Sequence, residues 1–123
     1  PLFAQCTKRD LRAVARHLEL LTSIEGRAIV TEGEAGDAFY LVLDGELVVA
    51  TRGADTARLG PGQWFGELSL LDPAPRSATV TAACPVVLGV LSVRMFRVLL
   101  REYPEISGAL LASLAAQLKE ARR

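Results

Sequence analysis

Three residues in the middle of the chain have side chains suited to an anionic ligand that also carries hydroxyl groups. Glu67 supplies a carboxylate, and Arg76 supplies a planar guanidinium whose N–H groups match the oxygens of a phosphate. The Ser77 hydroxyl follows directly. Because a buried phosphate needs charged donors and a buried hydroxyl needs an acceptor, this set favours a ligand such as a nucleotide.

The residues around this set support the same interpretation. Gly66 lets another group approach the backbone closely, and residues 67–71 can form one helical turn whose first N–H groups point at an anion. Pro73 and Pro75 stiffen the approach to Arg76. A second interpretation pairs Glu67 with Arg76 in a structural salt bridge that closes the loop, and charge spacing alone leaves both open.

The composition predicts one domain and argues against a nucleic-acid-binding segment. The chain has 123 residues, of which 50% are hydrophobic, enough for a single modest core. Fourteen basic residues balance fourteen acidic ones, so no broad positive field attracts nucleic acid or an anionic membrane.

The cysteines and the N-terminal residue bear on the cellular compartment of the protein and on whether the chain is part of a larger one. Cys6 and Cys84 are too few for a secreted disulfide scaffold, which favours a reducing compartment and predicts a cytoplasmic protein. No apolar run approaches the roughly 20 residues of a membrane span, and no leader sequence is apparent. The chain begins with Pro1 rather than Met, so we expect either a fragment or a processed product of a larger protein.

Neither a metal cofactor nor a catalytic residue is predicted within this chain. Roll-shaped enzymes of the cupin type usually gather several histidines with carboxylates, whereas His17 is the only histidine here and is expected at the surface. The acidic, glycine-containing segment 33–37 departs from the spacing of an EF-hand.

The N-terminal part predicts a helix over residues 7–22. Thr7 to Asp10 has the form of a capping box. Apolar residues then recur at helical spacing: Leu11, Val14, Ala15, Leu18 and Leu21.

Residues 24–92 carry short apolar runs separated by glycines, which predicts many short strands in a closed roll. The candidate strands are 24–30, 38–43, 46–51, 56–59, 77–84 and 86–91. Asp44-Gly45 indicates a hairpin turn, and Trp64 and Phe65 are expected as core anchors.

Residues 93–123 predict two helices that meet at Pro104. Ser92 is the expected N-cap of the first. The second carries an apolar stripe formed by Ile106, Leu110, Leu111, Leu114 and Leu118. Such a stripe can cover the core or form the seam of a homodimer, and the proline makes the pair a candidate moving part.

The segments Phe65-Gly66-Glu67-Leu68 and 75–80 together resemble the phosphate-binding cassette, residues 65–80, of cyclic nucleotide-binding domains. These domains occur in the protein kinase A regulatory subunit and the bacterial catabolite activator protein. Residues 32–46 are similar to the family's glycine-punctuated hairpin. The resemblance implies a mainly β domain over 1–123: an eight-stranded antiparallel β-roll of jelly-roll type with an N-terminal helix, a short cassette helix and C-terminal hinge and lid helices.

The resemblance also implies roles for the site residues. Glu67 matches the acceptor for the ribose 2′-hydroxyl, Arg76 matches the arginine that pairs with the cyclic phosphate, and Ser77 matches a position that adds a hydroxyl contact. Backbone contacts to ribose or phosphate are implied at Gly66, Leu68 and Ser69.

Contacts to the base are less defined. Leu47 and Val49 share one face of their predicted strand and can form an apolar wall against the base, although core packing explains them equally well. Candidate lid residues are Leu110, Leu114 and Leu118, without the aromatic cap of some relatives. Ser77 is compatible with the bacterial cAMP-binding pattern, so cAMP is the expected ligand and cGMP the alternative.

Together these features predict a regulatory sensor module whose C-terminal helices move over the captured nucleotide and control an attached domain or partner. The alternative is a domain of the same fold that has no ligand and serves as a protein-interaction module.

Overall fold

The computed structural model describes residues 3–71 and 74–121 of the 123-residue chain. Within these ranges it describes every side chain except those of Leu68, Leu114, Gln117, Leu118, Glu120 and Ala121. The chain divides into two compact units, a β unit formed by Glu19–Val93 and a helical unit formed by Pro1–Leu18 with Arg94–Arg123. The assignment of 1–123 to a single domain stays a prediction.

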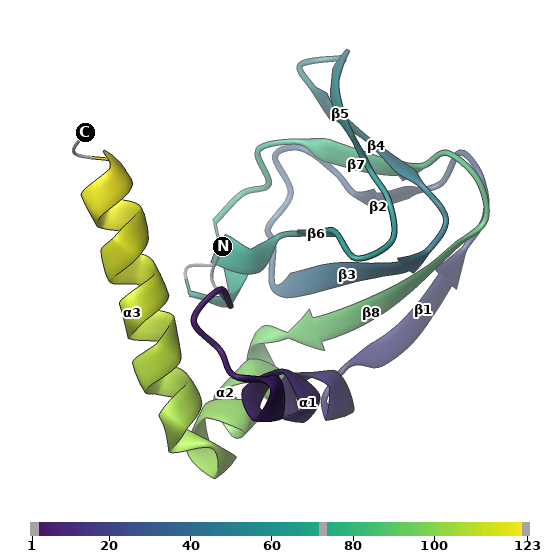
Figure 1. Cartoon of the computed structure of the whole chain (residues 1–123). Coiled ribbons are helices and arrows are strands. Elements are labelled where there is room, and N and C mark those ends of the chain that lie inside the picture. The colour runs from purple at the N-terminus through teal and green to yellow at the C-terminus, as the bar shows by residue number, and fades with distance from the viewer. Residues whose placement is uncertain (1–2, 72–73, 122–123) are drawn as a thin grey trace. The chain divides into compact units, whose positions relative to one another are not determined.

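The β unit contains eight strands in two four-stranded sheets, with strand orders β1-β8-β3-β6 and β2-β7-β4-β5 (Figure 1). Every pairing is antiparallel. The elements are β1 (Glu19–Ser23), β2 (Ala28–Val30), β3 (Ala38–Asp44), β4 (Leu47–Thr51), β5 (Ala54–Leu59), β6 (Trp64–Phe65), the 3-10 helix η1 (Glu67–Leu70), β7 (Thr79–Ala82) and β8 (Val86–Ser92). The predicted antiparallel, eight-stranded, mainly β fold is confirmed.

The hydrophobic core of the β unit lies between the two sheets. Its buried cluster takes Val42, Val86 and Leu88 from the first sheet, and Leu47, Val80 and Ala82 from the second. Alternate residues of β7 and β8 enter this cluster, as the two-residue period of a strand requires. The core therefore fixes the register of the strands that carry the site.

The turn predicted at Asp44-Gly45 is not a hairpin. It joins β3 to β4, which belong to different sheets, so it is a corner at which the chain crosses the core. Gly45 has φ +90°, and a Cβ there would meet the Pro85 carbonyl at 2.6 Å, which explains the glycine. The tight hairpin is β4–β5, where Arg52 and Gly53 both adopt positive φ.

The helical unit contains α1 (Lys8–Arg16), α2 (Val93–Glu102, whose first residue belongs to the β unit) and α3 (Pro104–Ala121). The predicted capping box of α1 is confirmed: Thr7 and Asp10 exchange backbone-to-side-chain hydrogen bonds of 3.0 and 3.2 Å. Phe96 and Leu99 of α2 and Ile106 and Leu110 of α3 are buried, whereas Leu111 is 66% exposed and does not belong to the buried stripe.

The predicted helix over 7–22 was too long. It ends at Arg16, because residues 19–23 instead form β1 and pair with β8. Leu21 lies opposite the fully buried Leu88 in that pairing. Strand pairing thus outweighs the helical spacing of the apolar residues, and Leu11, expected on the buried face of the helix, is 45% exposed.

His17 is not the surface residue that the sequence predicted. Its side chain is only 14% exposed, and its Nδ1 lies 2.8 Å from the Ala13 carbonyl, which identifies Nδ1 as the donor. Nε2 lies 3.6 Å from the Glu102 carboxylate, and the ring meets Tyr103 edge-on. His17 therefore connects α1 to the end of α2.

Two leucines in strands offer a direct test of the core. Leu47 is fully buried, and Leu20 is 75% exposed. Leu47→Ala should lower the free energy of unfolding by about 2–5 kcal/mol because it leaves a cavity between the sheets. Leu20→Ala should change it by less than about 0.5 kcal/mol. Equilibrium urea unfolding checks both, and equal effects would contradict the assignment of the core.

Candidate functional site

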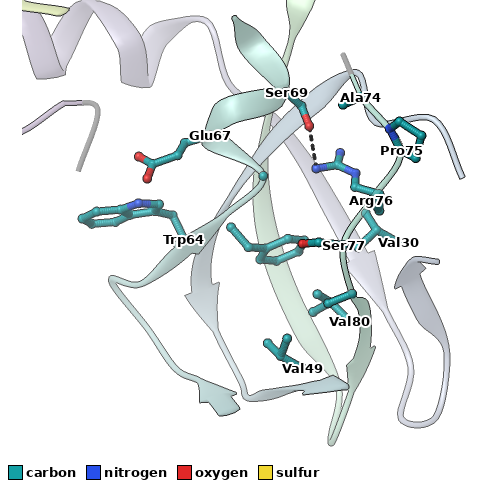
Figure 2. Close-up of a pocket in the computed structure, with 13 residues that line it drawn as sticks. Val30, Val49, Trp64, Glu67, Ser69, Ala74, Pro75, Arg76, Ser77 and Val80 are labelled. Carbon is teal, nitrogen blue, oxygen red and sulfur yellow. Dashed lines mark hydrogen bonds between the residues drawn. The ribbon is translucent and has the colours of Figure 1, made fainter. Parts of the chain in front are cut away.

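A cavity of about 490 Å³ opens in the β unit. Its walls come from β2, β4, β6, η1, β7 and the segment 74–78 (Figure 2). Val30, Val49 and Val80 form an apolar wall, while Glu67 and Arg76 supply the charges. The arrangement suits a ligand with one flat apolar part and one polar part.

Arg76 is held by two oxygens. Its Nη1 donates to the Ser69 hydroxyl at 3.0 Å, and its Nη2 donates to the Ala38 carbonyl at 2.8 Å. Figure 2 shows the guanidinium pointing toward Ser69, on η1. Both acceptors are neutral, so they orient the guanidinium without cancelling its charge.

The backbone on both sides of Arg76 is tied to the loop before β3. The Arg76 N–H donates to the Glu34 carbonyl at 2.8 Å, and the Arg76 carbonyl accepts from the Gly33 N–H at 2.8 Å. The Gly36 N–H donates to the Ala74 carbonyl at 3.2 Å. Residues about forty positions apart in the sequence thereby form one rigid frame for the arginine.

Tyr40, one member of a stacked aromatic pair, lies beside the Arg76 guanidinium. Tyr40 and Phe65 stack with their ring centres 4.8 Å apart and their planes 9° apart. The Arg76 guanidinium carbon lies 5.8 Å from the centre of the Tyr40 ring, within the range of a cation–π interaction. The pairing of β3 with β6 places Tyr40 directly opposite Phe65.

The charge of Arg76 has no carboxylate partner in the part of the chain that the structure describes. The interpretation of Glu67 and Arg76 as a loop-closing salt bridge is therefore not supported. In Figure 2 the Glu67 carboxylate points away from the guanidinium. A half-buried cation beside neutral oxygens is a strong attractor for an anion, because a bound anion recovers electrostatic stabilisation that water no longer supplies.

The cavity brings together most of the predicted site residues. Its lining includes Gly66, Glu67, Ser69, Arg76, Ser77 and Val49. The Ser69 N–H already donates to the Gly66 carbonyl at 3.1 Å, so a ligand can use that N–H only if the η1 turn changes. The Leu68 side chain lies outside the described residues.

The predicted base contact Leu47 and the predicted lid residues are not among the described residues that line the cavity. Leu47 is fully buried in the core and does not line the cavity, although Val49 on the same face of the strand does, so core packing rather than base contact explains Leu47. Of the lid residues, Leu110 is buried in the helical unit, and the side chains of Leu114 and Leu118 lie outside the described residues.

Sequence reasoning missed several residues of the site. Trp64, expected in the core, is 38% exposed and lines the cavity. Val30 and Val80 complete the apolar wall, and Tyr40 supports Arg76. Their positions follow from strand pairing, which single-sequence periodicity does not reveal. Nowhere in residues 3–71 and 74–121 do three or more histidine, cysteine or acidic side chains group as metal ligands would.

The family model for the cyclic nucleotide-binding domain matches residues 24–103, more than half of the chain. The chain belongs to this family. The match contains the whole cavity together with α2.

This chain is similar to parts of two proteins of different kinds, a potassium channel and a protein kinase regulatory subunit. A cyclic nucleotide-gated potassium channel of Mesorhizobium japonicum is 39% identical over 107 residues, which are 87% of this chain and 30% of the channel. A cAMP-dependent protein kinase regulatory subunit of Yarrowia lipolytica is 48% identical over 77 residues, 61% of this chain and 20% of that subunit. The chain thus spans less than a third of either relative.

The fold is similar to that of a solved bacterial domain. The N-terminal domain of a transcriptional regulator from Streptomyces coelicolor superposes with a TM-score of 0.92 at 33% identity, covering 99% of this chain and 88% of that domain. Among the described residues, no helix combines the length and the apolar character needed to cross a membrane.

Tyr40 provides a test of the packing behind Arg76. Burial raises the pKa of the Tyr40 phenol above its usual 10.0; the nearby Arg76 charge acts in the opposite direction and Asp37 adds to the rise. The folded protein therefore holds this proton more tightly than the unfolded chain does. Stability from this group is complete below about pH 10 and is lost as the pH rises through the folded pKa.

The measurement uses the fact that the chain has two tyrosines. In Tyr103→Phe, phenolate absorbance reports Tyr40 alone and should appear only above the usual phenol pKa. In Tyr40→Phe, the free energy of unfolding should fall less steeply over the same alkaline range. An unshifted titration in Tyr103→Phe would contradict the buried position of Tyr40.

Proposed function

We propose that this chain is a regulatory module that binds a cyclic nucleotide, in the first place cAMP, and that binding controls an attached domain or a partner. The observation that carries the proposal is the Arg76 guanidinium, held by Ser69 and Ala38 beside a cavity of about 490 Å³ and without a carboxylate partner in the described ranges. A cyclic phosphate supplies the missing negative charge.

The remaining groups of the ligand have matching positions in the cavity. Glu67 accepts a hydrogen bond from the ribose 2′-hydroxyl, and the valine wall formed by Val30, Val49 and Val80 packs against the base. The exposed Ser77 hydroxyl adds a contact to the phosphate or the base. The backbone at Gly66, Leu68 and Ser69 completes the phosphate and ribose contacts.

The preference for cAMP rests on two supports. Ser77 is compatible with the cAMP-binding pattern, and the similar kinase subunit is named as cAMP-dependent. The channel relative is named only as cyclic nucleotide-gated, so cGMP is the competing ligand.

The regulatory step requires the C-terminal helices to respond to the ligand. The nucleotide can move α2 and α3 only by binding one of their arrangements more tightly than the other. The output belongs to parts outside this chain, since the similar proteins include a channel and a kinase subunit. Pairing of two copies through α3 is part of the same proposal.

We place this activity in the cytoplasm. Cys6 and Cys84 are free thiols, as expected in a reducing compartment.

Calorimetric titration with cAMP, cGMP and AMP tests the phosphate contact. Arg76→Ala should weaken cyclic nucleotide binding by on the order of 2–5 kcal/mol, roughly thirty-fold to several thousand-fold, because it leaves a desolvated phosphate without its charged donor. The matched control is Arg58→Ala, since Arg58 is 65% exposed and pairs with Glu46 on the surface. AMP should bind much more weakly than the preferred cyclic nucleotide.

The outcomes separate the two functions. Equal affinity in wild type and Arg76→Ala would remove Arg76 from the site. A folded wild-type protein that binds neither cyclic nucleotide would favour the interaction module without a ligand.

Glu67 is tested with a ligand that lacks one hydroxyl. The wild-type protein should bind 2′-deoxy-cAMP about 5- to 30-fold more weakly than cAMP, because a charge-assisted hydrogen bond is lost. In Glu67→Gln that ratio should shrink toward one, as measured by the same titration. A ratio that Glu67→Gln leaves unchanged would assign the ribose contact to another residue.

A further inference from the structure

The surroundings of Arg76 contain more than is needed to place a positive charge in the cavity. Two hydrogen-bond acceptors, one aromatic face and two glycines enclose the guanidinium. We infer that Gly36 and Ser69 are positioning residues that fix the direction of the Arg76 guanidinium before the nucleotide arrives. This inference rests on the proposed function and deepens it.

Gly36 acts through the space it leaves. A Cβ at this position would overlap the Nε and Cζ atoms of Arg76, closer than real contacts allow. Gly36 is buried and does not have positive φ, so its backbone conformation does not call for glycine. The absence of a side chain is what lets the guanidinium occupy its slot.

Gly66 leaves space for the terminal Nη1 of the same Arg76 side chain. A Cβ there would overlap Nη1 of Arg76 and would approach the Ala38 carbonyl to 2.8 Å. Gly66 also has φ +79°, so both its backbone conformation and the space beside Arg76 favour glycine there. Gly36 is the cleaner position to test, because only the space favours glycine at that position.

Ser69 acts through its hydroxyl. The residue is 7% exposed, and its Oγ accepts the Nη1 hydrogen bond of 3.0 Å while the Ala38 carbonyl accepts from Nη2. Acceptors on both terminal nitrogens fix the plane of the guanidinium. Two of its five N–H groups are used in this way, which leaves three for a phosphate.

The consequence is preorganisation. A free arginine side chain loses much rotamer freedom when it binds, and an arginine already fixed in place does not pay this entropy again on binding. A guanidinium of fixed direction also distinguishes the two exocyclic oxygens of a cyclic phosphate, because its N–H groups reach one better than the other.

The first experiment compares the two phosphorothioate diastereomers of cAMP, in each of which sulfur replaces one exocyclic oxygen. The wild-type protein should prefer one diastereomer. Ser69→Ala should weaken cAMP binding about ten-fold and bring the affinity ratio of the diastereomers toward one. Gly36→Ala should do the same through displacement of Arg76. Gly60→Ala is the control, since a Cβ there meets nothing nearer than 4.0 Å.

The second experiment needs no nucleotide. In the ligand-free, nitrogen-15-labelled protein, NMR should show slow exchange of the Arg76 Nε–H with water and slow rotation of its guanidinium, and both should speed up in Ser69→Ala. Urea unfolding identifies any variant that has lost its fold. If Gly36→Ala fails to fold, Ser69→Ala still decides the inference.

The possible failures are distinguishable. Wild-type protein that binds no cyclic nucleotide overturns the proposed function, whereas the NMR comparison still tests how Arg76 is held. Nucleotide binding in which Ser69→Ala keeps both the diastereomer ratio and the exchange rate of wild type overturns this inference alone.

Discussion

The β unit is arranged around one electrostatic constraint. The Arg76 guanidinium is half-buried, and its hydrogen-bond acceptors are neutral oxygens. Holding Arg76 there requires the loop before β3, which bonds to its backbone on both sides, and η1, which supplies the Ser69 hydroxyl. The loop and η1 are in turn fixed by β3, whose Val42 side chain is fully buried between the sheets. The core is therefore what makes a costly charge placement tolerable.

The sequence predicted those parts of the fold in which local and tertiary preferences agree. Strands β3, β4 and β8 appear within one residue of their predicted ranges, because their apolar runs also contribute buried residues to the core. Prediction failed where distant pairing partners determine the secondary structure or the type of turn. Residues 19–23 have helical spacing yet pair with β8, and Asp44-Gly45 has the sequence of a hairpin yet joins two sheets. A short window of sequence around these residues contains neither their pairing partner β8 nor the strands of the second sheet.

The site shows the same division. Glu67 and Arg76 were found because a motif places chemistry-bearing residues at fixed spacing, and both line one cavity. Tyr40 and Gly36 were not found, because their roles exist only once the loop before β3 folds against Arg76. A glycine in a turn usually indicates backbone conformation, and nothing in the sequence indicates that Gly36 instead makes room for a side chain forty residues away.

A preset arginine has a consequence for how such a module switches. If the Arg76 guanidinium has the same position in both arrangements of the protein, its contact with the phosphate strengthens binding to both equally and shifts no equilibrium. The free energy that drives switching must then come from groups that change partners when the ligand arrives. The Ser69 N–H is a candidate, because it already donates to the Gly66 carbonyl at the start of η1 and can reach a ligand only if that turn opens. In the sensor proposed above, Arg76 would then provide affinity, and the short helix η1 would couple the nucleotide to the rest of the chain.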